Sequence, residues 1–180
     1  MKTLMIHEVH PWMLDVDFSS FDLITFDDGL YTQYLNLDFF LGLGIPLIFF
    51  VSTGIISEGE QNPEVIACAA AHKNFFDNGD TSAYMDWDQI KEIHDSDNAE
   101  IGGHSHNHFF LDHRQGIKEI YDIIKKDLSD MNEAFKEHNI SVDSYCYPYN
   151  NEVPLVKTEL KKYNINRLFG KERIPIEDLK

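Results

Sequence analysis

Apolar segments of strand length alternate along this chain with longer segments that have a helical period. Short apolar runs that end at turn-forming or polar residues predict strands at 22–26, 46–52, 99–103, 144–149 and 166–170. Segments whose apolar residues recur every three or four positions predict helices at 31–41, 62–76, 87–94 and 115–138. The run 46–52 is apolar without a break, which is typical of a strand buried on both faces of a parallel sheet. The alternation favours an α/β fold with a mainly parallel sheet.

The length and charge of the chain narrow its class. A chain of 180 residues predicts one domain, spanning residues 1–180. It carries 15 Lys and Arg against 31 Asp and Glu, which gives a net charge of −16. Nucleic acids and anionic membrane surfaces are bound through basic side chains, so neither is expected as a partner.

The distribution of apolar residues also bears on location. No stretch of the sequence approaches the 18 or so apolar residues that a membrane span needs, so we expect no membrane insertion. The first ten residues contain only a four-residue apolar run, too short for the apolar core of a signal peptide. The two cysteines do not make a disulfide framework. These features predict a cytoplasmic protein.

Polar clusters follow three of the predicted strands, where α/β folds bind their ligands. They are Asp-Asp-Gly at 27–29, His-Ser-His-Asn-His at 104–108 and Tyr-Pro-Tyr at 147–149. Taken alone, the first is typical of a turn, the second of a solvated loop and the third of packing. Together they point to a site.

The spacing of the histidines suggests metal chemistry. His104 and His108 are four residues apart, so one helical turn would place both imidazoles on the same side. Two histidines and one carboxylate leave positions open on a divalent metal ion. Either Asp27 or Asp28 could supply that carboxylate, and the other could accept a proton from water on the ion.

Several motifs resemble those of the polysaccharide deacetylase family, the NodB-homology domain of carbohydrate esterases. Thr-Phe-Asp-Asp-Gly at 25–29 is similar to the TFDDG signature of that family, and residues 104–108 match its second motif, His-Ser/Thr-x-x-His. The segment 44–54 looks like its second strand, and the residues around 85–89 and 100–104 look like its approach to the second motif. The agreement runs from about residue 23 to residue 150.

The resemblance implies a distorted, incomplete (β/α) barrel and a metal centre that holds Zn²⁺ or another divalent ion such as Co²⁺ or Ni²⁺. Matched residue by residue, Asp28, His104 and His108 would be the metal ligands, and Asp27 would be the base that deprotonates water on the metal. Tyr149 would bind substrate by donating its backbone N–H to the oxyanion.

The chain departs from the family pattern at two places. Many members carry an arginine two residues before the proline of the third motif, where this chain has Cys146, and Arg167 or Arg173 are the candidates to replace it. The late Leu-x-x-x-x-x-His-Asp motif, which supplies the general acid, is absent. A rearranged branch, similar to the poly-N-acetylglucosamine deacetylases, carries that histidine before TFDDG. The segment 5–9 looks similar, so His7 is the expected acid and His10 the alternative.

These residues predict a metal-dependent hydrolase that removes an N- or O-acetyl group from a sugar or glycan precursor. The expected cytoplasmic location favours an intracellular precursor that is linked to a lipid or a nucleotide. A homodimer is one way in which the open side of the barrel could be closed. A catalytically silent module that binds glycans or proteins stays open as an alternative. A metallo-phosphoesterase or amidohydrolase that uses His104 and His106 also stays open.

The remaining polar residues suggest no role. Cys68 lies among alanines and is interpreted as a small buried filler. His106 alternates away from its neighbours and is expected in solvent or behind the ligands. The other histidines are expected at the surface: His72, His94, His113 and His138.

Overall fold

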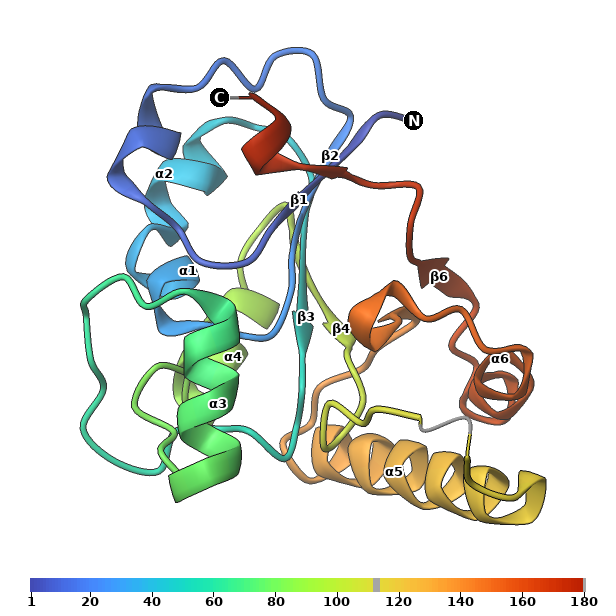
Figure 1. Ribbon diagram of the computed structural model, residues 1–180. Coiled ribbons are helices and arrows are strands. Elements are labelled where there is room, and N and C mark those ends of the chain that lie inside the picture. Colours follow the sequence, from blue (N-terminus) through green and yellow to red (C-terminus); the bar gives the residue numbers. More distant parts are fainter. Residues whose placement is uncertain (112–113, 180) are drawn as a thin grey trace.

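The computed structural model describes residues 1–111 and 114–179. Its centre is a seven-stranded sheet in the order β6-β5-β4-β3-β2-β1-β7, and the pairings between neighbouring strands are parallel (Figure 1). The strands are β1 (Thr3–Ile6), β2 (Leu23–Phe26), β3 (Leu47–Val51), β4 (Ala99–Gly103), β5 (Ser144–Cys146), β6 (Arg167–Phe169) and β7 (Ile174–Pro175). Within the described residues β6 and β7 are the two edges of this curled sheet. The predicted distorted, incomplete (β/α) barrel is confirmed.

Helices pack against one face of the curled sheet, because side chains from four of them form a single cluster with Phe26, Phe49 and Ile101. They are α1 (Tyr31–Leu35), α2 (Leu37–Gly42), α3 (Cys68–Asn78), α4 (Trp87–His94), α5 (Ile117–Glu137) and α6 (Pro154–Leu160). In the view of Figure 1, α1 to α4 lie to the left of β3, and α5 and α6 lie to its right. Four short 3₁₀ turns complete the described elements, at Pro11–Asp15, Pro148–Asn150, Lys161–Tyr163 and Ile176–Leu179. None of the helices in these ranges is both long enough and apolar enough to cross a bilayer.

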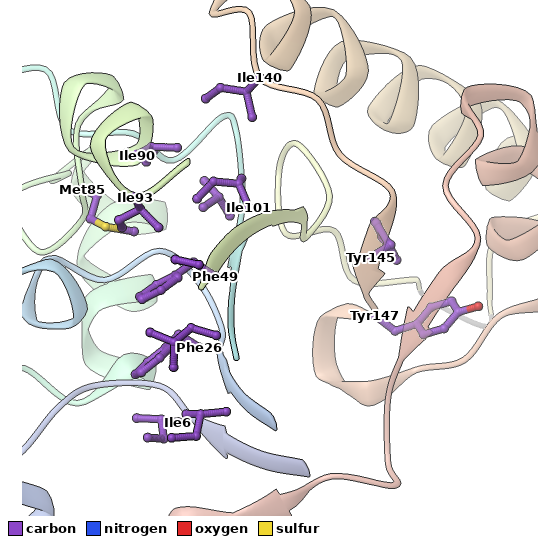
Figure 2. Packing of buried hydrophobic residues seen from close by; sticks show 14 of the residues in the cluster. Ile6, Phe26, Phe49, Met85, Ile90, Ile93, Ile101, Ile140, Tyr145 and Tyr147 are labelled. Atoms are coloured by element: carbon purple, nitrogen blue, oxygen red, sulfur yellow. The ribbon is translucent and has the colours of Figure 1, made fainter. Parts of the chain in front are cut away.

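A row of buried side chains across four strands holds the sheet in register. Ile6, Phe26, Phe49 and Ile101 are partners in successive parallel pairings, and Figure 2 shows them stacked one above the next. The rings of Phe26 and Phe49 are nearly parallel, with centroids 4.4 Å apart. Side chains of this kind are the main stabilising contribution of a sheet, and here they bring the carboxyl ends of the strands to one edge.

The residues singled out by their motifs stand at that edge. β1 ends one residue before His7, β2 one residue before Asp27, and β4 one residue before His104. The fifth strand was expected to continue to residue 149, but β5 ends at Cys146 and a 3₁₀ turn follows. Pro148 lacks the N–H that a further strand pairing would need.

Two predicted helices differ from the observed ones. The segment 31–41 is divided into α1 and α2 at Asn36, whose side chain donates a hydrogen bond to the carbonyl oxygen of Thr32 and whose backbone leaves the helical region. The segment 62–76 is helical only from Cys68 and continues to Asn78. Pro63 disfavours a helical conformation at Asn62, and Ala67 directly before the helix has a non-helical ψ of 135°. The predicted helix at 87–94 is confirmed, and the Asp86 side chain caps it.

Gly102 in β4 gives a test of how tightly the sheet is packed. A Cβ atom at this position would lie 2.5 Å from the ring of Phe50 and 2.6 Å from the hydroxyl of Ser144. We expect Gly102→Ala to lower the free energy of unfolding by about 1–3 kcal/mol, measured by urea denaturation. Gly42→Ala is the control, because nothing lies within 4 Å of its added methyl group. Equal effects of the two changes would contradict this packing.

Candidate active site

The chain turns sharply after β2, and this turn sends two adjacent carboxylates to different partners. Asp28 and Gly29 both have a positive φ, 73° and 72°, which Gly adopts freely and Asp tolerates better than most residues. Both Asp27 and Asp28 are almost fully buried. Buried carboxylates need charged or hydrogen-bonding partners, so their surroundings define the site.

Asp28 lies among histidines. Its Oδ1 atom is 3.2 Å from Nε2 of His104 and 3.1 Å from Nε2 of His108. One ligand atom from each of these three residues lies within 4.8 Å of the other two. The predicted metal ligands therefore converge on one point.

The two histidines converge through a loop, so the expected helical turn was wrong. Ser105 and His108 have positive φ values, 72° and 48°, which curl the chain back after β4. The buried Asp127 of α5 fixes this loop, because its carboxylate accepts hydrogen bonds from the backbone N–H groups of His106 and Asn107, each 2.8 Å long. Sequence reasoning missed Asp127. Its signal was a carboxylate on the apolar stripe of the helix.

The donor set fits a cation. His104 Nδ1 is 2.9 Å from the carbonyl oxygen of Cys146, so it donates its proton there and Nε2 is left with a lone pair toward Asp28. Asp28 Oδ1 is buried and has no hydrogen-bond partner among the described residues. Burial opposes a charged His104, but Asp28 outweighs it and raises the pKa of that histidine. Asp28 therefore favours a positive charge between itself and the histidines.

Asp27 is held by an arginine from the other end of the chain. Arg173 donates two hydrogen bonds to its carboxylate, from Nη1 to Oδ1 at 2.6 Å and from Nη2 to Oδ2 at 2.8 Å. Arg173 is also buried, and its Nη2 lies 2.9 Å from Sγ of Cys146. Burial favours the neutral form of Asp27, but Arg173 outweighs it and keeps the pKa of Asp27 below its ordinary value. Asp27 is therefore ionised at neutral pH.

The same contacts decide between the two arginines. Arg173 brings its guanidinium to Cys146, the position where many family members carry an arginine. Arg167 instead pairs at the surface with Glu100 and Asp143.

His7 lies at the edge of the same cluster. Its Nε2 is 3.9 Å from Oδ2 of Asp28, and its side chain is 31% exposed. The buried Gln33 donates hydrogen bonds to the backbone carbonyls of both His7 and Asp27, which ties the ends of β1 and β2 together. The alternative candidate, His10, faces Glu8 at 3.4 Å.

Tyr149 borders the metal ligands from the turn after β5. Its backbone has a φ of 56°, and its ring centroid lies 4.6 Å from that of His108. The side chain is 55% exposed, and its ring contacts the exposed ring of Phe110 edge to face. Two aromatic faces are therefore available to a ligand beside the histidines.

The sequence pattern of the polysaccharide deacetylase family matches residues 22–168. The chain belongs to this family. The match contains β2 through β5 and the start of β6, and of the site residues described above it leaves out His7, His10 and Arg173. Membership of a polysaccharide deacetylase family supports an enzyme that removes acetyl groups from sugar polymers. No curated protein matches the sequence.

Solved structures share the fold of this deacetylase-family chain at low sequence identity. IcaB from Ammonifex degensii is 18% identical with a TM-score of 0.68, over 94% of this chain and 82% of that one. A de-N-acetylase from Aggregatibacter actinomycetemcomitans is 12% identical with a TM-score of 0.67, over 97% and 92% of the two chains. A family 4 carbohydrate esterase pseudoenzyme from Bacillus anthracis is 15% identical with a TM-score of 0.52, over 93% and 43%.

Two residues that the sequence placed elsewhere lie against the ligands of this deacetylase-family site. Cys68 was interpreted as a buried filler, but its Sγ donates to Oδ2 of Asp28 at 2.9 Å. His72 was expected at the surface, but its Nε2 is buried and lies 3.6 Å from Oδ1 of Asp28. They lie one turn apart on α3, so the side chains of this helix share a face that the alanine-rich sequence did not reveal.

The contacts of the other described histidines are with residues other than Asp28. Nδ1 of His106 is 2.9 Å from the hydroxyl of Thr53. His94 is half-buried, and His138 is half-buried and stacks on Trp87. The expectation for His113 falls outside the described residues.

The buried pair of Arg173 and Asp27 gives a matched test. We expect Arg173→Gln to lower the free energy of unfolding at pH 7 by about 3–5 kcal/mol, because it leaves Asp27 buried and unpaired. Arg167→Gln is the control, and its exposed ion pairs should contribute about 1 kcal/mol or less. Urea denaturation of both variants measures the difference, and equal losses would contradict the assignment.

The pH dependence of that loss follows from the pKa of Asp27. The pKa in the folded protein lies below the ordinary value of 3.8, so the pair contributes its full stability above that pH. The contribution is lost as the pH falls through the folded-state pKa. The difference between wild type and Arg173→Gln should therefore be large at pH 7 and shrink in acid.

Proposed function

We propose that this protein is a metal-dependent deacetylase that hydrolyses an N- or O-acetyl group on a sugar. The observation that carries the proposal is the division of labour between adjacent carboxylates. Asp28 faces two histidine nitrogens, whereas Asp27 is paired separately with Arg173. A ligand set with an independent, ionised carboxylate beside it is what hydrolysis at a metal requires.

Asp28, His104 and His108 are the residues that would hold the ion. Two imidazole nitrogens and one carboxylate oxygen suit Zn²⁺, with Co²⁺ or Ni²⁺ as substitutes, and three protein ligands leave positions open for water and substrate. When bound, such an ion polarises the acetyl carbonyl and makes water more acidic.

Asp27 is the general base in this proposal. Its carboxylate is ionised at neutral pH because of Arg173, so it can accept the proton of the attacking water. The two hydrogen bonds from the guanidinium also fix the orientation of the carboxylate. A general base is most effective when it is already oriented before the substrate binds.

His7 and Tyr149 complete the proposed machinery. His7 is close to Asp28 and partly exposed, so it can reach a bound substrate and protonate the departing amine or alkoxide. The backbone N–H of Tyr149 donates to the oxyanion, a type of contact that contributes about 2.7–4 kcal/mol in other enzymes. The exposed rings of Tyr149 and Phe110 offer apolar faces to the sugar.

Two contacts favour an enzyme over a catalytically silent module. The catalytically silent alternative rested on two residues of the family motifs that this chain lacks, the arginine of the third motif and the late histidine. Arg173 pairs with Asp27 beside Cys146, so it can take the role of that arginine, and His7 near the start of the chain lies close to Asp28. The contact of His106 with Thr53 likewise favours the deacetylase over a site built on His104 and His106.

Metal retention tests the ligand assignment. The test uses a Cys68→Ser background, because the Cys68 thiol also contacts Asp28. In that background, metal-free protein given one equivalent of Zn²⁺ and then dialysed should retain the ion, and adding either His104→Ala or His108→Ala should release it. His106→Ala is the matched control and should retain the ion, because its ring contacts Thr53. Retention by the His108→Ala variant together with loss from His106→Ala would support the phosphoesterase or amidohydrolase alternative instead.

Acetate release tests the role of Asp27. On zinc-loaded protein with N-acetylglucosamine oligomers or O-acetylated sugars, we expect Asp27→Asn to lower kcat by about 10²–10⁴-fold while the zinc content stays unchanged. Asp38→Asn, an exposed change of the same type, should leave the rate unaltered. No acetate from any acetylated sugar or polymer by the zinc-loaded wild type would favour the silent module.

A further inference from the structure

The two oxygens of the Asp28 carboxylate face different side chains. Oδ1 faces the nitrogens of His104 and His108. Oδ2 lies 2.9 Å from Sγ of Cys68 and 3.9 Å from Nε2 of His7. Neither Cys68 nor His7 belongs to the first ligand set of Asp28, His104 and His108. We propose that His7, Asp28 and Cys68 form a second cation site, which takes a thiophilic divalent ion such as Zn²⁺ and shares Asp28 with the first.

The second set is as compact as the first. One ligand atom of each of its three residues lies within 4.8 Å of the other two. His7 follows β1, Asp28 follows β2, and Cys68 begins α3, so the set joins three elements that packing already fixes. The backbone N–H of Cys68 also donates to the carboxylate of Glu8 at 3.1 Å, which anchors the start of the helix.

The chemistry of these donors selects the kind of ion. Binding of an ion would displace the proton that the Cys68 thiol donates to Asp28 and release it to solvent. A thiolate, an imidazole nitrogen and a carboxylate oxygen together are ligands that Zn²⁺ takes in proteins, whereas Mg²⁺ and Ca²⁺ prefer oxygen alone. The half-buried thiol and the partly exposed imidazole leave the set accessible from solvent.

His72 also lies close to Asp28, but it belongs to neither set of donors. Nδ1 of His72 lies 3.2 Å from the carbonyl oxygen of Cys68, and its buried Nε2 lies 3.6 Å from Asp28 Oδ1. Its ring stacks on that of His108, with centroids 4.3 Å apart and planes 26° apart. His72 therefore packs against a ligand of the first set and is not itself one of the three donors.

Occupation of the second site would have a functional consequence that rests on the proposed function. A histidine that binds an ion through Nε2 cannot donate a proton from that atom. Zn²⁺ in excess of one equivalent should therefore inhibit the enzyme by removing His7 from acid catalysis.

Titration of metal-free protein with Co²⁺ alone tests the site without reference to activity. Wild type should bind two equivalents, and one of them should produce the near-ultraviolet charge-transfer band of a cobalt–thiolate bond. Cys68→Ser should lose the band and one equivalent. His108→Ala should lose the other equivalent and keep the band, and Cys146→Ser is the matched control that should keep both ions and the band.

Three results would overturn the second site. They are a single equivalent in wild type, two equivalents with no thiolate band, and a band that disappears with Cys146 and survives in Cys68→Ser. A single ion with a band that depends on Cys68 would make Cys68 a ligand of the first ion. The proposed function fails separately, if protein with the first ion bound releases no acetate.

Discussion

The buried ion pair between Asp27 and Arg173 is the interaction on which the site depends. It joins residues 146 positions apart in the sequence and holds the segment before β7 against the end of β2. Two charges out of water are costly, and their attraction repays that cost only with good geometry and further hydrogen bonds. Arg173 has both, because it is bidentate to Asp27 and also contacts Thr25 and Cys146.

This pair also separates the roles of two carboxylates that are neighbours in the chain. Without Arg173, Asp27 and Asp28 would compete for the same cation. With Arg173 present, the guanidinium balances the negative charge of Asp27. The lone pairs of Asp28 are then left to the histidines and to Cys68. The turn with two positive φ values makes the separation geometrically available. The parallel sheet then brings the donors of β1 and β4 to the same edge.

Much of the fold and the first ligand set could be predicted, because short-range signals carry them. Apolar runs located the strands β2, β3 and β4, and the motif at 25–29 located both carboxylates. The helix division at Asn36 was missed, since it depends on one side chain competing with the backbone. The convergence of His104 and His108 was predicted for a wrong reason, because a loop held by Asp127 produces it.

Long-range contacts account for what the sequence left unresolved. Nothing near Arg173 in the sequence distinguishes it from Arg167, and only the position of β7 beside β1 brings it to Asp27. Cys68 and His72 lie in an alanine-rich helix whose direction is set by packing against Leu30 and Tyr84. Their proximity to Asp28 is a property of the tertiary structure alone.

The most direct test is a crystal structure of the protein with one equivalent of Zn²⁺, with the ion located by anomalous scattering at the zinc edge. We expect one strong peak bonded to Asp28, His104 Nε2 and His108 Nε2, with the Asp27 carboxylate still paired to Arg173. A peak bonded to Asp27, His104 and Cys146, another compact group of donors, would contradict it.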